Sequence, residues 1–479
     1  MAAMGSRNLI IAAACVAGLA ACAVKPPPAP EADRKDAQQA TEVRATWAKA
    51  DAAGADSTTT AVSDNWLASF YDPQLTALVN EAIARNPDLR AAGARVEQAA
   101  AYAHSAQAEL LPWFNLLGTG GIKAGGGSDL SSALSGLMLG VSWEPDLWGR
   151  LRYGRNAAED TYASAQADFE FARQSLAAQT ARSWFMAIET KLELDAAESM
   201  AAAAQSLVSL AQDRQRVGNG SDKDVTMTRA GLGTMEDSAR QARLAHEQAV
   251  RSLETILGRY PATELAVATQ LPAMPGPVPV GMPLSMLERR PDLIAAERRV
   301  AAAFNRVGEA KAAQLPTIRL NASVAALSSD VLQLKDDYSN PSGGAGGTLF
   351  APLYHGGAMR AQVELRTAEQ KEAVALYGSQ VLRALGDVEN ALSASQILSQ
   401  RVGILGQVLA DQEKTLEYDQ QAYRVGSLDM RSVQQQQQQV QAARVNYLRA
   451  TSEELSQRVN LHLVLGGSFA EPVTLAASK

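Results

Sequence analysis

The chain has 479 residues and a formal net charge of −7. Because it has no basic excess to neutralise phosphates, the composition argues against a nucleic-acid-binding protein. Aromatic residues make up only 5% of the chain while alanine is abundant. The usual bulky core is therefore missing, and close packing of long helices is the natural replacement.

The N-terminus has the pattern of an export signal. Arg7 supplies a positive charge, and Leu9 to Ala21 is an apolar run that ends in small residues. The run is too short to span a membrane as a helix. Leu19-Ala20-Ala21-Cys22 resembles the bacterial lipobox. We therefore expect residues 1–21 to be removed and acyl chains, such as palmitate, to be attached to Cys22, each buried methylene contributing about 0.8 kcal/mol to membrane binding.

Residues 22–63 are rich in Pro, Ala, Asp, Thr and Ser and have no apolar periodicity, which predicts an extended or disordered lipidated leash. Cys15 lies in the run that would be removed, so the mature chain would keep only the acylated Cys22. This excludes a disulfide and a cysteine metal site. The four histidines share no ligand spacing, so no metal site is expected.

The rest of the chain contains an internal sequence repeat of two units. Asn86–Val96 (NPDLRAAGARV) returns as Arg290–Val300 (RPDLIAAERRV) at an offset of 204, and Leu257-Gly258 returns as Leu465-Gly466 at 208. Landmarks in one order, with an offset that drifts by only four residues, indicate duplication of one structural unit. We therefore expect one architecture in residues 64–270 and again in residues 271–479.

Each half is predicted to begin with helices. Apolar residues between Trp66 and Val79 cluster as on the inner face of a short helix. A longer helix is predicted from Pro87 to Leu111, with Asn86 as its cap, and from Pro291 to Leu315 in the second half. A proline follows each of these helices and stops it.

After each proline the apolar period changes to two. Residues 317–326 alternate between polar and apolar side chains, and residues 113–119 do so less clearly. Glycine-rich stretches at 124–128 and 342–347 are interpreted as loops before return strands, giving hairpins at about 113–143 and 317–351. Strands with one apolar face suit a membrane barrel, but the smallest such barrels have about eight strands. Several chains must therefore pool their strands.

Long helices are predicted to follow each hairpin. No proline occurs between Pro145 and Pro261 or between Pro352 and Pro472. We predict helices from Arg150 to Arg216 and from Gly357 to Arg424, each about 100 Å long at ~1.5 Å per residue. Gly218 and Gly426 can each supply a left-handed cap that reverses the chain. Shorter helices then return, over roughly 222–257 and 429–465.

These features together resemble the outer-membrane factor family, the TolC-like exit ducts of tripartite efflux and type I secretion systems. The resemblance covers essentially the whole mature chain. The lipobox is similar to that of the lipoprotein branch associated with resistance-nodulation-division pumps. The matching pieces are Trp143 to Arg150 (WEPDLWGR), Arg289 to Leu293 (RRPDL) with Ala296 to Arg299, Ala310 to Ala313 before Leu315-Pro316, and Leu465-Gly466-Gly467.

The resemblance implies a mainly helical homotrimer. Four strands per chain would form one outer-membrane β-barrel, continuous with a long periplasmic α-helical barrel. The implied function is passive conduction of drugs or other small compounds, delivered by an inner-membrane pump, of the resistance-nodulation-division class, through a periplasmic adaptor. The protein would not be an enzyme, would need no cofactor beyond the acyl chains on Cys22, and would be lipid-anchored in the outer membrane and extend into the periplasm.

Two alternatives stay open. One is a type I secretion exit duct of the same family. The other, from a different class, is a periplasmic helical adaptor or scaffold lipoprotein, which would lack two matched strand pairs with lipid-compatible faces. A lipid-anchored enzyme would need a cleft with convergent polar groups, which the sequence does not indicate. Glu144 and Asp146 are interpreted as a structural corner between strand and helix rather than as an acid-base pair.

The resemblance also places a closed periplasmic aperture at the helical tips. Tyr423 stands where the family commonly has a tip tyrosine, whereas Arg431 and Gln435 replace an apolar residue and an aspartate that are frequent in drug-efflux relatives. Nearby acidic residues could pair with tip arginines, or could only complement helix dipoles. Neutralising Arg424 or Tyr423 is expected to loosen the closed state. The aperture candidates are Arg214, Arg216, Gly218, Asp222, Asp224, Tyr423, Arg424, Gly426, Asp429, Arg431 and Gln435.

Overall fold

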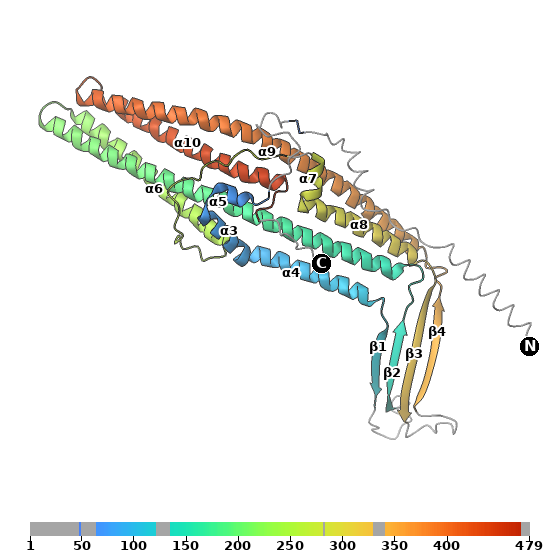
Figure 1. Ribbon diagram of the computed structural model, residues 1–479. Coiled ribbons are helices and arrows are strands. Elements are labelled where there is room, and N and C mark those ends of the chain that lie inside the picture. Colours follow the sequence, from blue (N-terminus) through green and yellow to red (C-terminus); the bar gives the residue numbers. More distant parts are fainter. Residues whose placement is uncertain (1–46, 49–63, 121–134, 281–282, 329–340, 471–479) are drawn as a thin grey trace, which may run out of the picture. The chain divides into compact units, whose positions relative to one another are not determined.

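The computed structural model describes residues 47–48, 64–120, 135–280, 283–328 and 341–470 (Figure 1). The predicted signal, Cys22, nearly all of the leash and the glycine-rich stretch at 124–128 lie outside these residues. The chain divides into two compact units. One contains residues 95–166 and 295–379, and the other contains 42–94, 167–294 and 380–479. Each unit therefore combines segments from both sequence halves.

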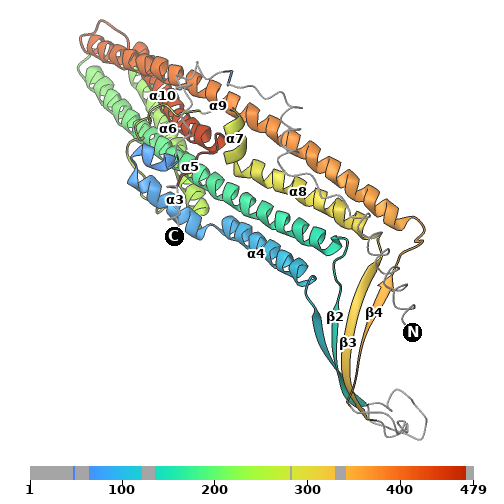
Figure 2. The same ribbon diagram turned by 45° about the vertical axis from the view of Figure 1, so that its right-hand side comes forward.

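The first unit contains one antiparallel sheet of four strands. Its order is β1 (Trp113–Thr119), β2 (Ser135–Trp143), β3 (Thr317–Ser328) and β4 (Ser342–Phe350), as Figures 1 and 2 show. Each half supplies one hairpin, as predicted, and β2 pairs with β3 to join the two. The interpretation of 342–347 as a loop was wrong, because these residues belong to β4. Glycine weakens a strand but keeps both backbone groups for the ladder, and Gly343 pairs with Val324.

The strand register gives the sheet two different faces. Leu116, Leu139 and Val324 are in register on one face, which is apolar and exposed. Asn115 and Ser323 are in register on the other, which is mostly polar. This alternation confirms the predicted period of two. Three exposed apolar residues, Trp113, Leu117 and Phe350, lie on the polar face.

Two helices of equal length precede the hairpins, α4 (Pro87–Ala108) and α8 (Pro291–Ala312). The predicted cap is confirmed, because Asn86 Oδ1 accepts hydrogen bonds from the backbone N–H groups of Asp88 and Leu89, at 2.9 and 3.0 Å. Each helix ends three residues earlier than predicted. The backbone bonds become i to i−3 there, as from Leu111 N to the Ala108 carbonyl, since a proline disfavours helical geometry in the residue before it.

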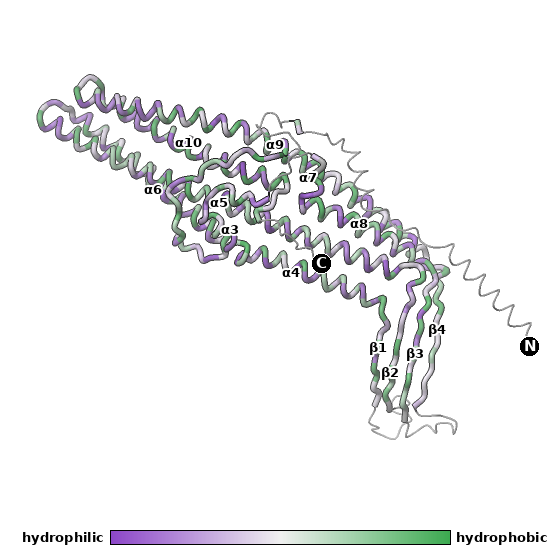
Figure 3. The backbone as a smooth tube through the Cα atoms, in the orientation of Figure 1, coloured by the Kyte–Doolittle hydropathy of each residue, from purple (hydrophilic) through white to green (hydrophobic). Residues whose placement is uncertain are grey.

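The long helices are confirmed as α5 (Arg150–Arg216) and α9 (Ala358–Arg424), of 67 residues each. They are followed by α6 (Asp222–Ile256) and α10 (Met430–Val464), of 35 residues each. Hydrophilic and hydrophobic residues are mixed along these helices (Figure 3). None of the described helices combines the length and apolar content needed to cross a membrane.

The four helices α5, α6, α9 and α10 end in the same turn. Glycines 218, 258, 426 and 466 all have φ between 72° and 82°. At the end of α5, Asn219 N donates to the Arg214 carbonyl and Gly218 N to the Gln215 carbonyl, at 2.8 and 3.0 Å. This is the Schellman pattern, which favours glycine because its φ is positive. A Cβ on Gly258 would also lie 2.9 Å from the Arg85 carbonyl oxygen, whereas a Cβ on Gly218 would meet open space.

The main core lies in the second unit. It is built from η2 (Trp66–Phe70), α3 (Pro73–Arg85), the middle of α5 and the C-terminal parts of α6 and α10. The short helix α7 (Pro283–Arg289) precedes α8. Asp72 caps α3 by accepting from Gln74 N and Leu75 N, and its other oxygen accepts from the Trp184 indole at 2.8 Å. The capping carboxylate therefore connects the first helices to α5.

One pair of equivalent positions in the two halves carries different chemistry. At the 208-residue offset of the closing turns, Glu254 corresponds to His462, and both are buried, with 2% and 4% of their surface exposed. Glu254 accepts backbone hydrogen bonds from residues 263, 264 and 265, at 2.8, 2.8 and 3.0 Å. His462 instead stacks on Trp66 at 6.0 Å between ring centroids, and burial lowers its pKa to about 4.

Candidate channel aperture and strand-to-helix junction

The tips of the second unit are the turns that join α5 to α6 and α9 to α10. Ser221 and Asp224 form a capping box at the start of α6. Asp429 caps α10 by accepting from Ser432 N and Oγ at 2.9 and 2.8 Å, and these bonds lower the pKa of Asp429. Asp222 accepts a hydrogen bond from Gln215 across its own turn. The acidic candidates therefore mainly form hydrogen bonds within their own turn, at the start of a helix, where acidic caps are favoured.

One contact joins the two tips directly. Arg214 Nη1, at the end of α5, donates to the backbone carbonyl of Tyr423 at 2.9 Å. The same guanidinium lies 4.7 Å from the centroid of the Tyr423 ring, close enough for a cation–π interaction. We call this pair the tip contact. Both residues were candidates from the sequence, but their pairing was not predicted.

Tyr423 is also part of a small apolar cluster. Only 5% of its surface is exposed, and burial raises the pKa of its phenol although the charge of Arg214 opposes the shift. The phenol therefore stays neutral, as the cluster requires. The residues packed together are Tyr423, Met430 and Val433, with Leu207, Leu210, Leu416 and Leu428 around them.

The other basic candidates are exposed. Arg216 pairs with Asp213 at 2.9 Å on the surface of α5, an arrangement that contributes little to stability. Arg424, Arg431 and Gln435 are also exposed. Within the described residues, no ion pair joins Arg216, Arg424 or Arg431 to the acidic residues at 222, 224 and 429.

A second link between the hairpins was missed at the sequence level. The Gln434 side chain donates to the Met227 carbonyl at 2.9 Å, joining α10 to α6. Gly231 makes room for it, since a Cβ there would lie 2.7 Å from the Gln434 amide nitrogen. The signal in the sequence was weak, because Gln434 begins a run of six glutamines that reads as a uniform polar face.

An ion-pair network lies further along the same helices. Arg449 on α10 contacts Glu193 on α5 at 2.9 Å and Glu189 at 4.0 Å. Burial raises the pKa of Glu189, although a hydrogen bond from Ser452 opposes the shift. This network connects helices from the two sequence halves away from the tips.

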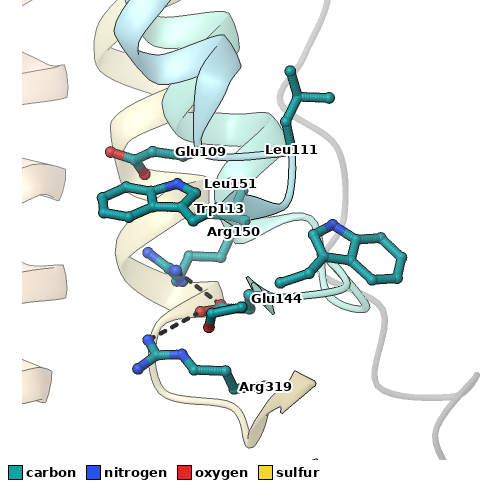
Figure 4. Close-up of a pocket in the computed structure, with 9 residues that line it drawn as sticks. Glu109, Leu111, Trp113, Glu144, Arg150, Leu151 and Arg319 are labelled. Carbon is teal, nitrogen blue, oxygen red and sulfur yellow. Dashed lines mark hydrogen bonds and ion pairs between the residues drawn. The ribbon is translucent and has the colours of Figure 1, made fainter. Parts of the chain in front are cut away.

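The first unit has a cavity of about 300 Å³ where the sheet meets the helices (Figure 4). Glu144, just after β2, accepts from Arg150 Nη2 at 2.8 Å and lies 3.7 Å from Arg319 Nη2 on β3. Asp146 accepts from Leu151 N and Arg152 N at 3.2 and 3.0 Å and so caps α5. These contacts agree with a structural corner. No cluster of potential metal ligands is found in the described part of the chain.

The family profile and the sequence relatives point to the same kind of protein. A profile of the family described as "Outer membrane efflux protein" matches residues 78–259 and 283–467. The chain is 30% identical over 422 residues to the pyoverdine export outer membrane protein OpmQ of Pseudomonas putida, covering 84% of this chain and 88% of that protein. It is 26% identical over 425 residues to the probable efflux pump outer membrane protein TtgC of the same species, covering 86% of each.

Solved structures agree with the sequence matches. The outer-membrane channel OprN superposes with a TM-score of 0.80 at 26% identity, covering 89% of this chain and 97% of that chain. Each of the two separate profile matches lies within one of the two halves that the internal repeat defines.

Proposed function

This chain belongs to the outer membrane efflux protein family and is an outer-membrane efflux channel; we propose that it works as a lipid-anchored homotrimer, the exit duct of a tripartite pump. In this proposal a periplasmic adaptor and an inner-membrane pump of the resistance-nodulation-division class deliver small compounds, which leave passively. The chain itself performs no catalysis. The acyl chains on Cys22 would hold it in the outer membrane.

The observation that carries the trimer is the four-strand sheet. One face is apolar, and β1 and β4 each have a free edge within the described residues. In lipid every backbone donor and acceptor must be paired, so a membrane sheet has to close on itself. Four strands are too few, since barrels have about eight or more. Three copies supply twelve strands, enough to close one barrel with the polar face inside.

The tip contact is the proposed closure of the aperture. Arg214 and Tyr423 connect the two helical hairpins of one copy, so opening of the tips would separate them. Relatives are named for different exported compounds, including pyoverdine for OpmQ and toluene for a TtgC protein. Similar channels thus serve different cargo, and we propose for this chain only that its cargo is small.

The test of this proposal is assembly and conduction. Outer-membrane fractions should give a heat-resistant band at three times the mass of the chain, and the purified protein should form pores in planar lipid bilayers. A water-soluble monomer without conductance would refute the proposal. A periplasmic adaptor or scaffold would give neither the band nor the pores, whereas loss of drug resistance or of protein secretion on gene deletion would distinguish efflux from type I secretion.

The lipid anchor has its own test. Cys22→Ser should abolish incorporation of labelled palmitate and leave the precursor uncleaved. Cys15→Ser is the matched control, since Cys15 lies in the predicted signal and should leave labelling unchanged. Equal labelling of both variants would contradict the proposed anchor.

A further inference from the structure

We propose that Arg319 selects cargo by charge: one Arg319 from each copy forms a ring of positive charge inside the pore, at the end of the strands nearest the helices, and this ring favours anionic groups. The proposal rests on the proposed function, because it requires strands from several copies to close with the polar face inward. It adds a specificity-determining residue to the channel.

The first argument is the position of Arg319 in the sheet. It is the only charged residue in the four strands. Its neighbours Ile318 and Leu320 belong to the apolar face, so Arg319 belongs to the polar face, where it pairs with Thr348. A charge on the lipid-facing side of such a strand would be destabilising. On the polar side it lies in the aqueous lumen.

The second argument is the local charge balance (Figure 4). Among the residues that the structure describes, Glu144 is the one carboxylate that contacts Arg319, and it makes its shorter contact, 2.8 Å, with Arg150. Two guanidinium groups therefore share this carboxylate, and Arg319, at 3.7 Å, has the longer contact of the two. Arg319 is the more exposed partner, with 64% of its side-chain surface accessible, against 28% for Arg150. The less closely paired charge is thus on the side chain that reaches solvent.

Glu109 also lines this cavity and is a second carboxylate to consider beside Arg319. In Figure 4 the indole of Trp113 lies between Glu109 and the side chain of Arg319. Neither Arg150 nor Arg319 has an ion pair with Glu109 among the described residues. Glu144 rather than Glu109 is therefore the carboxylate that moderates the charge of Arg319.

The third argument is physical. Rings of arginine or lysine make pores selective for anions. At 0.1 M salt a charge acts over about 10 Å before it is screened, and at 1 M over only about 3 Å. A ring at the inner end of the strands would therefore act on every permeating ion at low salt. The selectivity should weaken as the salt concentration rises.

The experiment is the reversal potential of the full-length trimer in planar bilayers under a KCl gradient. Removing the ring with Arg319→Gln should lower the chloride-to-potassium permeability ratio by roughly twofold or more at about 0.1 M salt, where screening is weak. Arg319→Lys keeps the charge and is the matched control, so it should retain the wild-type ratio. Arg319→Glu should shift the ratio further in the direction of potassium.

A second variant keeps the proposal testable if Arg319→Gln does not assemble into trimers. Asn321 lies on the same face, two residues along β3, and is exposed, so Asn321→Arg should raise the chloride preference. A pore whose reversal potential is the same in wild type, Arg319→Gln and Asn321→Arg would overturn the role of Arg319 and leave the channel function standing. Absence of any pore or trimer from the wild-type protein would instead contradict the proposed function.

Discussion

Loss of the tip contact should shift the equilibrium between the closed and open states in the direction of the open state, by an amount that can be calculated. Arg214→Ala removes a hydrogen bond from a charged donor, which contributes about 1.5–3 kcal/mol, and a cation–π contact of roughly 0.5–2 kcal/mol. Arg214 is half-buried, so the lower ends apply and the sum is about 2 kcal/mol. Since 1.4 kcal/mol corresponds to a factor of ten, we expect the closed tip of each copy to lose roughly 30-fold in its equilibrium with the open tip.

The assay is single-channel recording of open probability in planar bilayers. Arg216→Ala is the matched control, because it removes the same charge two residues away. Among the described residues, the ion pair of Arg216 is with Asp213 on the surface. Its open probability should stay near that of the wild type. Equal open probabilities for Arg214→Ala and Arg216→Ala would refute the reasoning, since a nonspecific charge effect would then explain both. The structure thus moves the expected effect from Arg424, which is exposed, to Arg214.

Three further predictions concern stability, measured as thermal unfolding of the trimer in detergent. Glu254→Gln should lower the free energy of unfolding by about 3 kcal/mol, because the new NH2 group faces backbone donors. The control Glu247→Gln, at a half-buried surface position, should lower it by less than about 0.5 kcal/mol, and equal effects would contradict the role of Glu254. The pKa of His462 is lowered to about 4, so the folded state should lose stability as pH falls from 6.5 toward 4. The loss in free energy of unfolding should be about 2 kcal/mol at pH 5. His462→Phe should remove this loss, and a pH profile that the substitution leaves unchanged would argue against the role of His462. Gly308→Ala should destabilise by about 1–3 kcal/mol, since its Cβ would lie 2.8 Å from the Tyr153 ring, while Gly386→Ala, in open space on α9, should stabilise by up to about 1 kcal/mol; the opposite order would refute the packing argument.

Much of the fold could be predicted because periodic patterns and stop signals are local. Pro87 with its Asn86 cap, the proline-free runs and the glycines at 218 and 426 fixed the helices to within a few residues. Residues 342–347, four of which are glycines, were misread because local propensity opposes a strand there, and only their pairing with β3 shows that they form one. Tertiary contacts override propensity in such cases.

The candidate site was less predictable for the same reason. The sequence could place charged residues at the tips, but whether Asp224 and Asp429 would cap helices or bind arginines depends on side-chain geometry. The pairing of Arg214 with Tyr423 spans 209 residues, and no local pattern encodes it. The position of Arg319 could be read from the alternation in β3, but its unequal share of Glu144 required the distances.

The mismatch between Glu254 and His462 has a consequence for how this duplicated chain withstands acid. In the first half, the buried position ties down the connection to the second half through three backbone N–H groups. In the second half, the same position holds a ring against Trp66 that must stay uncharged. Mild acidification would therefore strain the C-terminal copy first. The two halves of this duplicated chain are therefore expected to differ in their resistance to acid, and the second half is the more sensitive.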